Sequence, residues 1–194
     1  MSRTMSRPLS RPLAIVAGIG LLAAAYGVAA TTPTSQVVEA PFGSRGSIGD
    51  TITSSDLIAT VHDASLANEV ELGLWRGTTT GVWFVAEATI EATLTSRVIE
   101  IDLFIDGVRY VATGRGDGDT VDTNSVAVRF PTTGPLLIEL PADVLDFPGA
   151  RTAVLRISTF GDDRLEGVVE VVIDLTALDV DDRVELEPAR DGSR

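Results

Sequence analysis

The sequence predicts an all-β protein, an antiparallel β-sandwich preceded by one N-terminal hydrophobic helix. From residue 47 onward, apolar and polar residues alternate with a period of two over several segments, which is typical of half-buried strands. Segments with helical periodicity are scarce, so no crossover helices are expected. The hydrophobic helix is predicted from the first 30 residues, which contain the longest uncharged apolar run of the chain.

Residues 1–30 have the composition of a membrane-targeting segment. Residues 1–12 form a basic leader, expected in the cytoplasm, with three arginines and no acidic side chain. Residues 13–30 contain no charged side chain, and as a helix they would rise about 27 Å, close to the thickness of a bilayer's hydrocarbon core. Because the arginines precede this run and all acidic residues follow it, the positive-inside rule places the rest of the chain outside the cytoplasm.

Two interpretations of residues 13–30 stay open. The run is longer than the apolar core of a typical signal peptide, which favours a retained single-pass transmembrane anchor. It is also rich in alanine and glycine, and Val28-Ala29-Ala30 resembles a small-residue cleavage site, which favours a signal peptide and a secreted product. Residues 31–46 predict a polar linker in either case.

The composition excludes several classes of protein. The chain has no cysteine, so disulfides, thiolate metal sites, a cysteine nucleophile and lipid attachment through an N-terminal cysteine are all excluded. All 28 acidic residues but only 12 of the 15 arginines lie in residues 31–194, and such an excess of negative charge repels nucleic acid. The same excess keeps a domain soluble and would attract a cationic partner or a divalent ion.

The alternation is clearest in residues 82–95. There, Phe84 and Ile90 fall on one face, whereas Glu87 and Glu91 fall on the other. Alternation of this length indicates a half-buried strand, because a helix would scatter the glutamates among the apolar residues. The two glutamates would lie about 13 Å apart on an extended strand, too far for the paired carboxylates of a glycosidase. A solvated sheet face is therefore expected.

A β-hairpin is expected at Asp106-Gly107, between two β-rich runs. A type I′ turn needs positive φ at both central residues, and this dipeptide favours that conformation. Residues 140–150 predict a turn or a single helical turn after Pro141. In chain order, the candidate strands span residues 47–53, 57–62, 66–72, 82–95, 99–105, 108–113, 125–130, 135–140, 152–159 and 167–176. Their short spacing predicts one antiparallel sandwich over residues 47–180, followed by a disordered acidic tail at 181–194.

Four short sequences follow one another along this body: GSIGDTIT, GVWFVAEATIEAT, IDGVRY and LPADVL. Their order resembles the immunoglobulin-like extracellular domains of Gram-positive, actinobacterial bacteria. That group includes the mycobacterial immunoprotective extracellular protein group and a related domain often mislabelled telomeric repeat-binding factor. The resemblance covers residues 43–178 and implies an immunoglobulin-like β-sandwich in the cell envelope, without an established activity. It carries over no active-site residue; the matching positions look structural, and they are Gly49, Trp83, Asp106, Gly107, Tyr110 and Pro141.

Residues 115–124, RGDGDTVDTN, form the candidate metal site. Calcium favours oxygen ligands, and this glycine-rich segment gathers four of them, Asp117, Asp119, Asp122 and Asn124. The segment departs from the EF-hand pattern, because Val121 occupies the position of an oxygen ligand. A polar loop between strands is the alternative interpretation. No other cofactor is expected.

Trp75 and Arg76 are the candidate partner-binding residues. They lie in a Gly/Thr-rich segment, and tryptophan and arginine dominate many protein interfaces. The alternative is that Trp75 covers the edge of the core. His62 is the only histidine, and Asp63 is expected on the opposite face of its strand, so the two are not expected to form a catalytic dyad. No GxSxG nucleophile elbow accompanies them.

These observations favour a non-enzymatic extracytoplasmic domain that is tethered to the cell membrane through residues 13–30 and binds or supports another envelope component. One alternative is a cleaved and secreted binding domain of the antigen type. The other is an envelope hydrolase, for which the sequence offers no catalytic motif.

Overall fold

The computed structural model describes residues 20–21, 26, 42–113, 119–159 and 167–192. The chain divides into two compact units, residues 1–39 and 40–194. In the first unit the described residues are Gly20, Leu21 and Tyr26, which are helical, and the rest of the expected hydrophobic helix lies outside the described residues. The described residues include no helix with the length and hydropathy that a membrane crossing requires.

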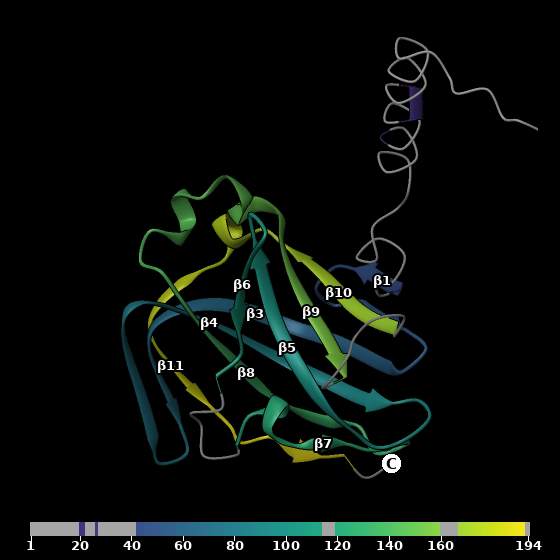
Figure 1. Cartoon of the computed structure of the whole chain (residues 1–194). Coiled ribbons are helices and arrows are strands. Elements are labelled where there is room, and N and C mark those ends of the chain that lie inside the picture. The colour runs from purple at the N-terminus through teal and green to yellow at the C-terminus, as the bar shows by residue number, and fades with distance from the viewer. Residues whose placement is uncertain (1–19, 22–25, 27–41, 114–118, 160–166, 193–194) are drawn as a thin grey trace, which may run out of the picture. The chain divides into compact units, whose positions relative to one another are not determined.

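The second unit is a sandwich of two β-sheets (Figure 1). The first, which we call sheet A, has the strand order β1 (Phe42–Gly46), β10 (Gly167–Ile173), β9 (Ala153–Thr159), β5 (Arg97–Ile105) and β6 (Val108–Val111), with β7 (Ser125–Val126) also pairing with β5. Sheet B has the order β11 (Val180–Leu186), β3 (Leu57–Leu72), β4 (Trp75–Ala92), β8 (Thr132–Leu140) and β12 (Arg190–Asp191), with β2 (Thr51–Thr53) beside β3. The predicted all-β sandwich is therefore confirmed.

The main hydrophobic core lies between the two sheets. The predicted alternation in β4 is confirmed, because Phe84 and Ile90 are fully buried in this core while Glu87 is exposed. On the facing sheet, β5 contributes Ile101 and Leu103. Side chains of this size stabilise a fold by about 1.5–3 kcal/mol each when fully buried, so the period-2 pattern accounts for most of the driving force.

The predicted hairpin at Asp106-Gly107 is present, with φ of 50° and 78° at the two residues. Asp106 also accepts a hydrogen bond from the backbone N–H of Gly149, at 2.9 Å, with its side-chain Oδ2. Gly149 lies in a 3-10 helix, Pro148–Thr152, and a Cβ at this position would collide with Asp106. The expected helical turn after Pro141 is a 3-10 helix at Val144–Asp146.

Several strand boundaries differ from those predicted. The two candidates at 57–62 and 66–72 form the single strand β3, and β4 begins at Trp75 and ends at Ala92. Two register shifts between β3 and β4 allow these strands to continue where the alternation is interrupted. Of the candidate at 47–53 only Thr51–Thr53 is a strand, and of 125–130 only Ser125–Val126. β1 lies at Phe42–Gly46, so the prediction of a linker up to residue 46 is wrong at its end.

The prediction of a purely antiparallel sandwich is wrong at two edges. β1 pairs with β10 in parallel, and β11 pairs with β3 in parallel. The second pairing also replaces the expected disordered tail, because β11 runs from Val180 to Leu186 and β12 pairs with β8 at Arg190 and Asp191. We call residues 180–192 the C-terminal strap. It closes one edge of sheet B and then crosses to the other.

Candidate functional site

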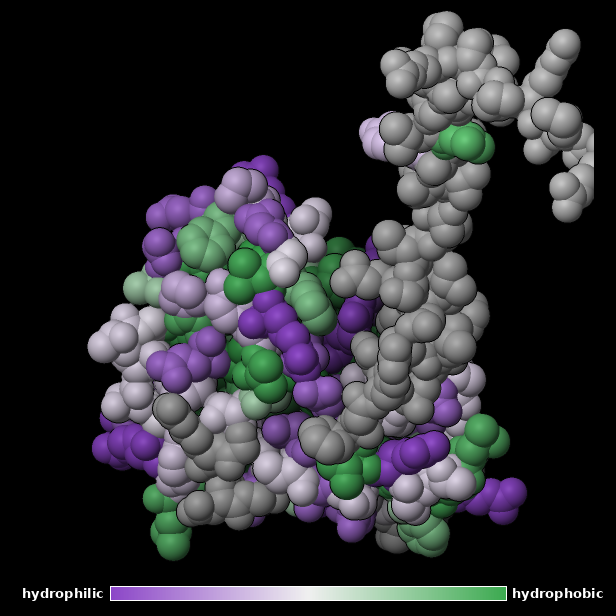
Figure 2. Space-filling model, in the orientation of Figure 1, coloured by the Kyte–Doolittle hydropathy of each residue, from purple (hydrophilic) through white to green (hydrophobic). Residues whose placement is uncertain are grey.

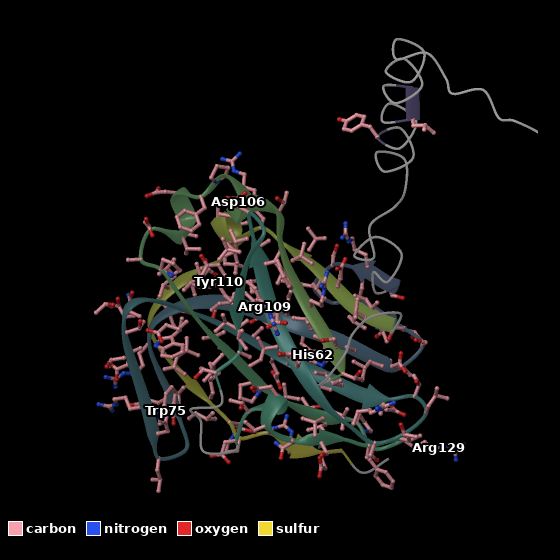
Figure 3. The ribbon with its side chains drawn as sticks, viewed as in Figure 1. His62, Trp75, Asp106, Arg109, Tyr110 and Arg129 are labelled. Atoms are coloured by element: carbon pink, nitrogen blue, oxygen red, sulfur yellow. The ribbon has the colours of Figure 1, made fainter. Side chains whose placement is uncertain are left out.

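The outer face of sheet B, the side away from the core, carries a row of polar side chains centred on His62, which Figure 3 labels. Its Nε2 lies 2.7 Å from Oγ1 of Thr89, which lies 2.7 Å from Oγ1 of Thr133. The β-bulge between Val61 and Asp63 leaves both His62 and Asp63 exposed, so the expectation that they face opposite sides of the strand is wrong. The imidazole nevertheless bonds to Thr89 rather than to the neighbouring carboxylate.

Beside this row, the C-terminal strap and the sheet enclose a groove. Its larger part has a volume of about 270 Å³ and lies between strap residues 185–190 and the sheet residues Glu87 and Thr133–Pro135. A smaller hollow of about 130 Å³ continues it toward Asp63 and Ser65. Glu87 and Leu186 line both hollows, which therefore adjoin one another, and we call the two together the strap groove.

Three contacts fix the strap over the sheet. Leu186 packs against a second, smaller apolar cluster on the outer face of sheet B. The backbone N–H of Ala189 donates to the carbonyl oxygen of Asp119, at 2.7 Å. A Cβ added to Gly134 would lie 2.5 Å from the Cβ of Ala189, so glycine at this position allows the strap to approach the strand closely. The groove is therefore built by residues far apart in the sequence.

The strap groove is acidic and contains one basic side chain. Its carboxylates are those of Asp63, Glu87, Glu185 and Glu187. Arg190 lies 3.0 Å from Glu187 and 3.9 Å from Glu87, which leaves a net negative charge in the groove. Its apolar lining comes from Pro135, Leu186 and Pro188. Such a lining suits a positively charged group on an apolar stem, as arginine and lysine side chains present.

The candidate calcium residues are only partly described, because Asp117 lies outside the described residues. The side-chain amide of Asn124 donates to the carbonyl oxygen of Thr120 at 3.0 Å. Asp122 is half-buried, and burial raises the pKa of its carboxyl group. Over residues 42–113, 119–159 and 167–192, no group of three or more histidine or acidic side chains is arranged to hold a metal ion. The calcium site stays a prediction.

Trp75 is half-buried and packs edge-to-face on Trp83, with ring centroids 5.9 Å apart. Its ring occupies the space that a side chain at Gly77 would need. The neighbouring Arg76 forms ion pairs with Glu69, at 3.0 Å, and with Glu71. The structure thus gives both residues intramolecular contacts, and their role in partner binding stays a prediction.

The outer face of sheet A holds a row of charges that the sequence analysis did not identify. Neighbouring strands place Arg45, Glu170, Arg156 and Asp102 side by side, with alternating sign. Glu170 accepts hydrogen bonds from Arg45 at 2.6 Å and from Arg156 at 2.8 Å. The period-2 pattern in β9 and β10 places Arg156 and Glu170 on the outer face, but only the strand order brings them together. Figure 2 shows the hydrophilic side chains that gather over β5 and β6.

The row continues beyond Asp102. Arg109 pairs with Asp102 through Nε at 2.9 Å and also with Glu100. The guanidinium of Arg156 lies 4.7 Å from the ring centre of Phe104, in a cation–π contact. Each arginine is engaged within the face, so the row functions as an internal support of sheet A rather than as an open site.

No family model and no curated protein matches the chain. Two solved structures are similar in part. One is an uncharacterised β-sandwich protein from Clostridium difficile 630, with 15% identity and a TM-score of 0.44, covering 72% of this chain and 99% of that chain. The other is a candidate lipoprotein from Staphylococcus aureus, with 14% identity and a TM-score of 0.42, covering 71% of this chain and 96% of that chain. Likeness at this level assigns neither a family nor a function.

Proposed function

We propose that the chain is a non-enzymatic, membrane-tethered extracytoplasmic domain, and that its strap groove binds a cationic segment of another envelope component. The groove carries this proposal, because it combines a net negative charge with apolar side chains in a hollow of about 270 Å³. The uncharged run at residues 13–30 and the arginines before it support the tether and the orientation. The resemblance to immunoglobulin-like envelope domains agrees with this role, which is a binding role rather than a catalytic one.

The chemistry of the groove favours arginine or lysine in the bound segment. A guanidinium or ammonium group would compete with Arg190 for Glu87 and Glu187, while its aliphatic stem would lie on Leu186 and the two prolines. These carboxylates are largely exposed, so each ion pair contributes little affinity by itself. Together they would speed association with a cationic partner, and binding would weaken as salt rises.

Binding of a fluorescent hexa-arginine peptide to the full-length chain in nanodiscs tests this function. We expect the double variant Glu87→Gln/Glu185→Gln to weaken binding by about five-fold at low salt, and high salt to remove the difference. The matched control is Asp143→Asn/Asp146→Asn, which removes the same charge from exposed positions outside the groove. Equal loss in both double variants would mean that only net charge matters, and the groove would no longer be the binding site.

Cell fractionation with intact-mass analysis distinguishes the membrane-tethered chain from the alternative, a cleaved and secreted product. A retained anchor predicts full-length protein in the membrane fraction. A soluble product that begins at Thr31 would overturn the tether while leaving the groove open to the peptide test.

A further inference from the structure

One end of the sandwich exposes large apolar side chains. Leu94, Val98 and Phe130 are 74%, 50% and 58% exposed. Two arginines, Arg97 and Arg129, are exposed beside them in the sequence. Hydrophobic side chains are visible at the lower right of the domain in Figure 2, and Figure 3 labels Arg129 in the same area. We call these five residues the end patch.

The strand pairings bring these residues to one end. β4 ends at Ala92, which bridges Val128, so the segments that carry Leu94 and Phe130 leave the sheets side by side. Val98, at the start of β5, pairs with Ser125 of β7. The turn at 127–130 is closed by a bridge between Ala127 and Phe130. The end patch is therefore a single surface formed by three chain segments.

The turn that presents Phe130 has an unusual backbone. Arg129 has a φ of +66°, in the left-handed region that is costly for a residue with a Cβ. Its backbone N–H donates to the carboxylate of Glu91 at 3.0 Å, which holds the turn in place. Because the arginine and the phenylalanine both remain exposed, the local strain serves to present them rather than to bury them.

The chain enters the sandwich at the same end. β1 pairs in parallel with β10, which is antiparallel to β9, and β9 is antiparallel to β5. β1 and β5 therefore run in the same direction. The register places Ser44 level with Val169, Ile157 and Ile101, so Phe42 lies at the end where β5 begins with Arg97. The described part of the domain thus begins at the same end of sheet A as the end patch, three strands away from β5.

We infer that the end patch rests on a phospholipid bilayer and fixes the orientation of the domain on the membrane. The inference rests on the tether of the proposed function. Residues 31–41 span at most about 38 Å when fully extended, which keeps the arriving end of the domain near the bilayer. Exposed leucine, valine and phenylalanine side chains enter the headgroup boundary, and arginines beside them bind lipid phosphates. A mixed apolar and basic surface is the chemistry that an otherwise acidic domain needs for such a contact.

The absence of cysteine from the chain allows one fluorophore to be placed at a chosen position. Ser96→Cys carries the label at the end patch, and Ala142→Cys carries it after β8, at the opposite end. The full-length chain is reconstituted in vesicles of phosphatidylcholine and phosphatidylglycerol that contain brominated lipid. We expect emission at position 96 to fall about two-fold and emission at position 142 to stay unchanged. Equal quenching at both positions, or none at 96, would overturn the inference.

A pair of double variants assigns the contact to the patch itself. Leu94→Ser/Phe130→Ser should remove the quenching at position 96, whereas the control Val108→Ser/Leu145→Ser, at exposed positions of the opposite end, should leave it intact. Flotation of the same vesicles reports on the tether. Chain that floats without quenching at 96 overturns the orientation and leaves the tether standing, whereas chain that fails to float overturns both.

Discussion

The outer faces of the two sheets are closed in different ways. On sheet A, alternating charges form a row across β1, β10, β9 and β5, and the carboxylate of Glu170 is largely buried within it. On sheet B, an apolar cluster around Trp83 lies under Trp75 and the C-terminal strap. The same period-2 alternation produces both faces. It determines which residues turn away from the core, but what those residues then do depends on the neighbouring strand.

The difference has consequences for how each face responds to conditions. An apolar cluster is insensitive to pH, because it contains no titrating group, and it is not weakened by the screening of charges. The charged row depends on the ionisation of two carboxyl groups in unlike surroundings. Burial alone would raise the pKa of Glu170, but hydrogen bonds from Arg45 and Arg156 outweigh it and hold that pKa below its usual value. Burial raises the pKa of Asp102, despite the opposing hydrogen bond and charge of Arg109.

The largest effect is expected on sheet B. Replacing Trp83 by alanine should lower the free energy of unfolding by about 3–5 kcal/mol, because a fully buried indole leaves a cavity that the sheet cannot close. Trp83→Phe should cost only about 1 kcal/mol, since Nε1 of the indole has no hydrogen-bond partner among the described residues. Urea denaturation measures both. A phenylalanine variant as unstable as the alanine variant would show that the ring volume alone does not explain the cluster.

A smaller loss of stability is expected for a substitution on sheet A. Glu170→Gln should lower the free energy of unfolding by about 1.5–3 kcal/mol at neutral pH, because it weakens hydrogen bonds from two arginines. The folded-state pKa of Glu170 is depressed, so its contribution is complete above the unfolded pKa of about 4.3 and is lost as pH falls through the folded pKa. The gap between wild type and variant should close on acidification. Melting curves from pH 7 down to about 3 measure it, and a constant gap would contradict the depressed pKa.

The smallest effect, with the opposite sign of pH dependence, is expected for Asp102→Asn. One oxygen of the Asp102 carboxylate pairs with Arg109, whereas Oδ1 has no partner among the described residues. Because the folded pKa is raised, the wild type loses stability as pH rises above the unfolded value of about 3.9. Between pH 4 and pH 7, the free energy of unfolding of the variant should therefore rise relative to that of the wild type, by under about 1 kcal/mol. If the variant instead became less stable relative to the wild type over this range, the effect of Arg109 on the pKa of Asp102 would outweigh that of burial.

The sequence predicted the sandwich, the alternation in β4 and the hairpin at Asp106-Gly107, because each depends on neighbours along the chain. It did not predict a strand in the tail, because the acidic residues of 180–186 conceal a short alternation in which Val184 and Leu186 face the apolar cluster on the outer face of sheet B. It also placed His62 and Asp63 on opposite faces, because a bulge has no reliable signal in one sequence.

The candidate site was harder to predict. The strap groove exists only because β11 and β12 return residues 180–192 to the opposite edges of sheet B. Glu87 was recognised as an outward-facing carboxylate, but nothing local links it to Glu185 or Arg190. Pairings of this separation lie beyond any periodicity argument, and the same holds for Arg45 beside Glu170.

The late position of β11 in the chain has a consequence for folding. β4 pairs with β3 from Leu57 to Leu72, and β2 covers the start of the other edge of β3. Leu66–Leu72 on that other edge pair with β11, which leaves a ribosome or a translocation channel after β1 to β10. Until then, that edge presents unpaired backbone groups beside apolar side chains, a template for pairing with another chain. The charged residues of β11 keep this strand soluble before it pairs with β3. The pairing of β11 with β3 is parallel and joins residues far apart in the sequence, so we expect it to form slowly.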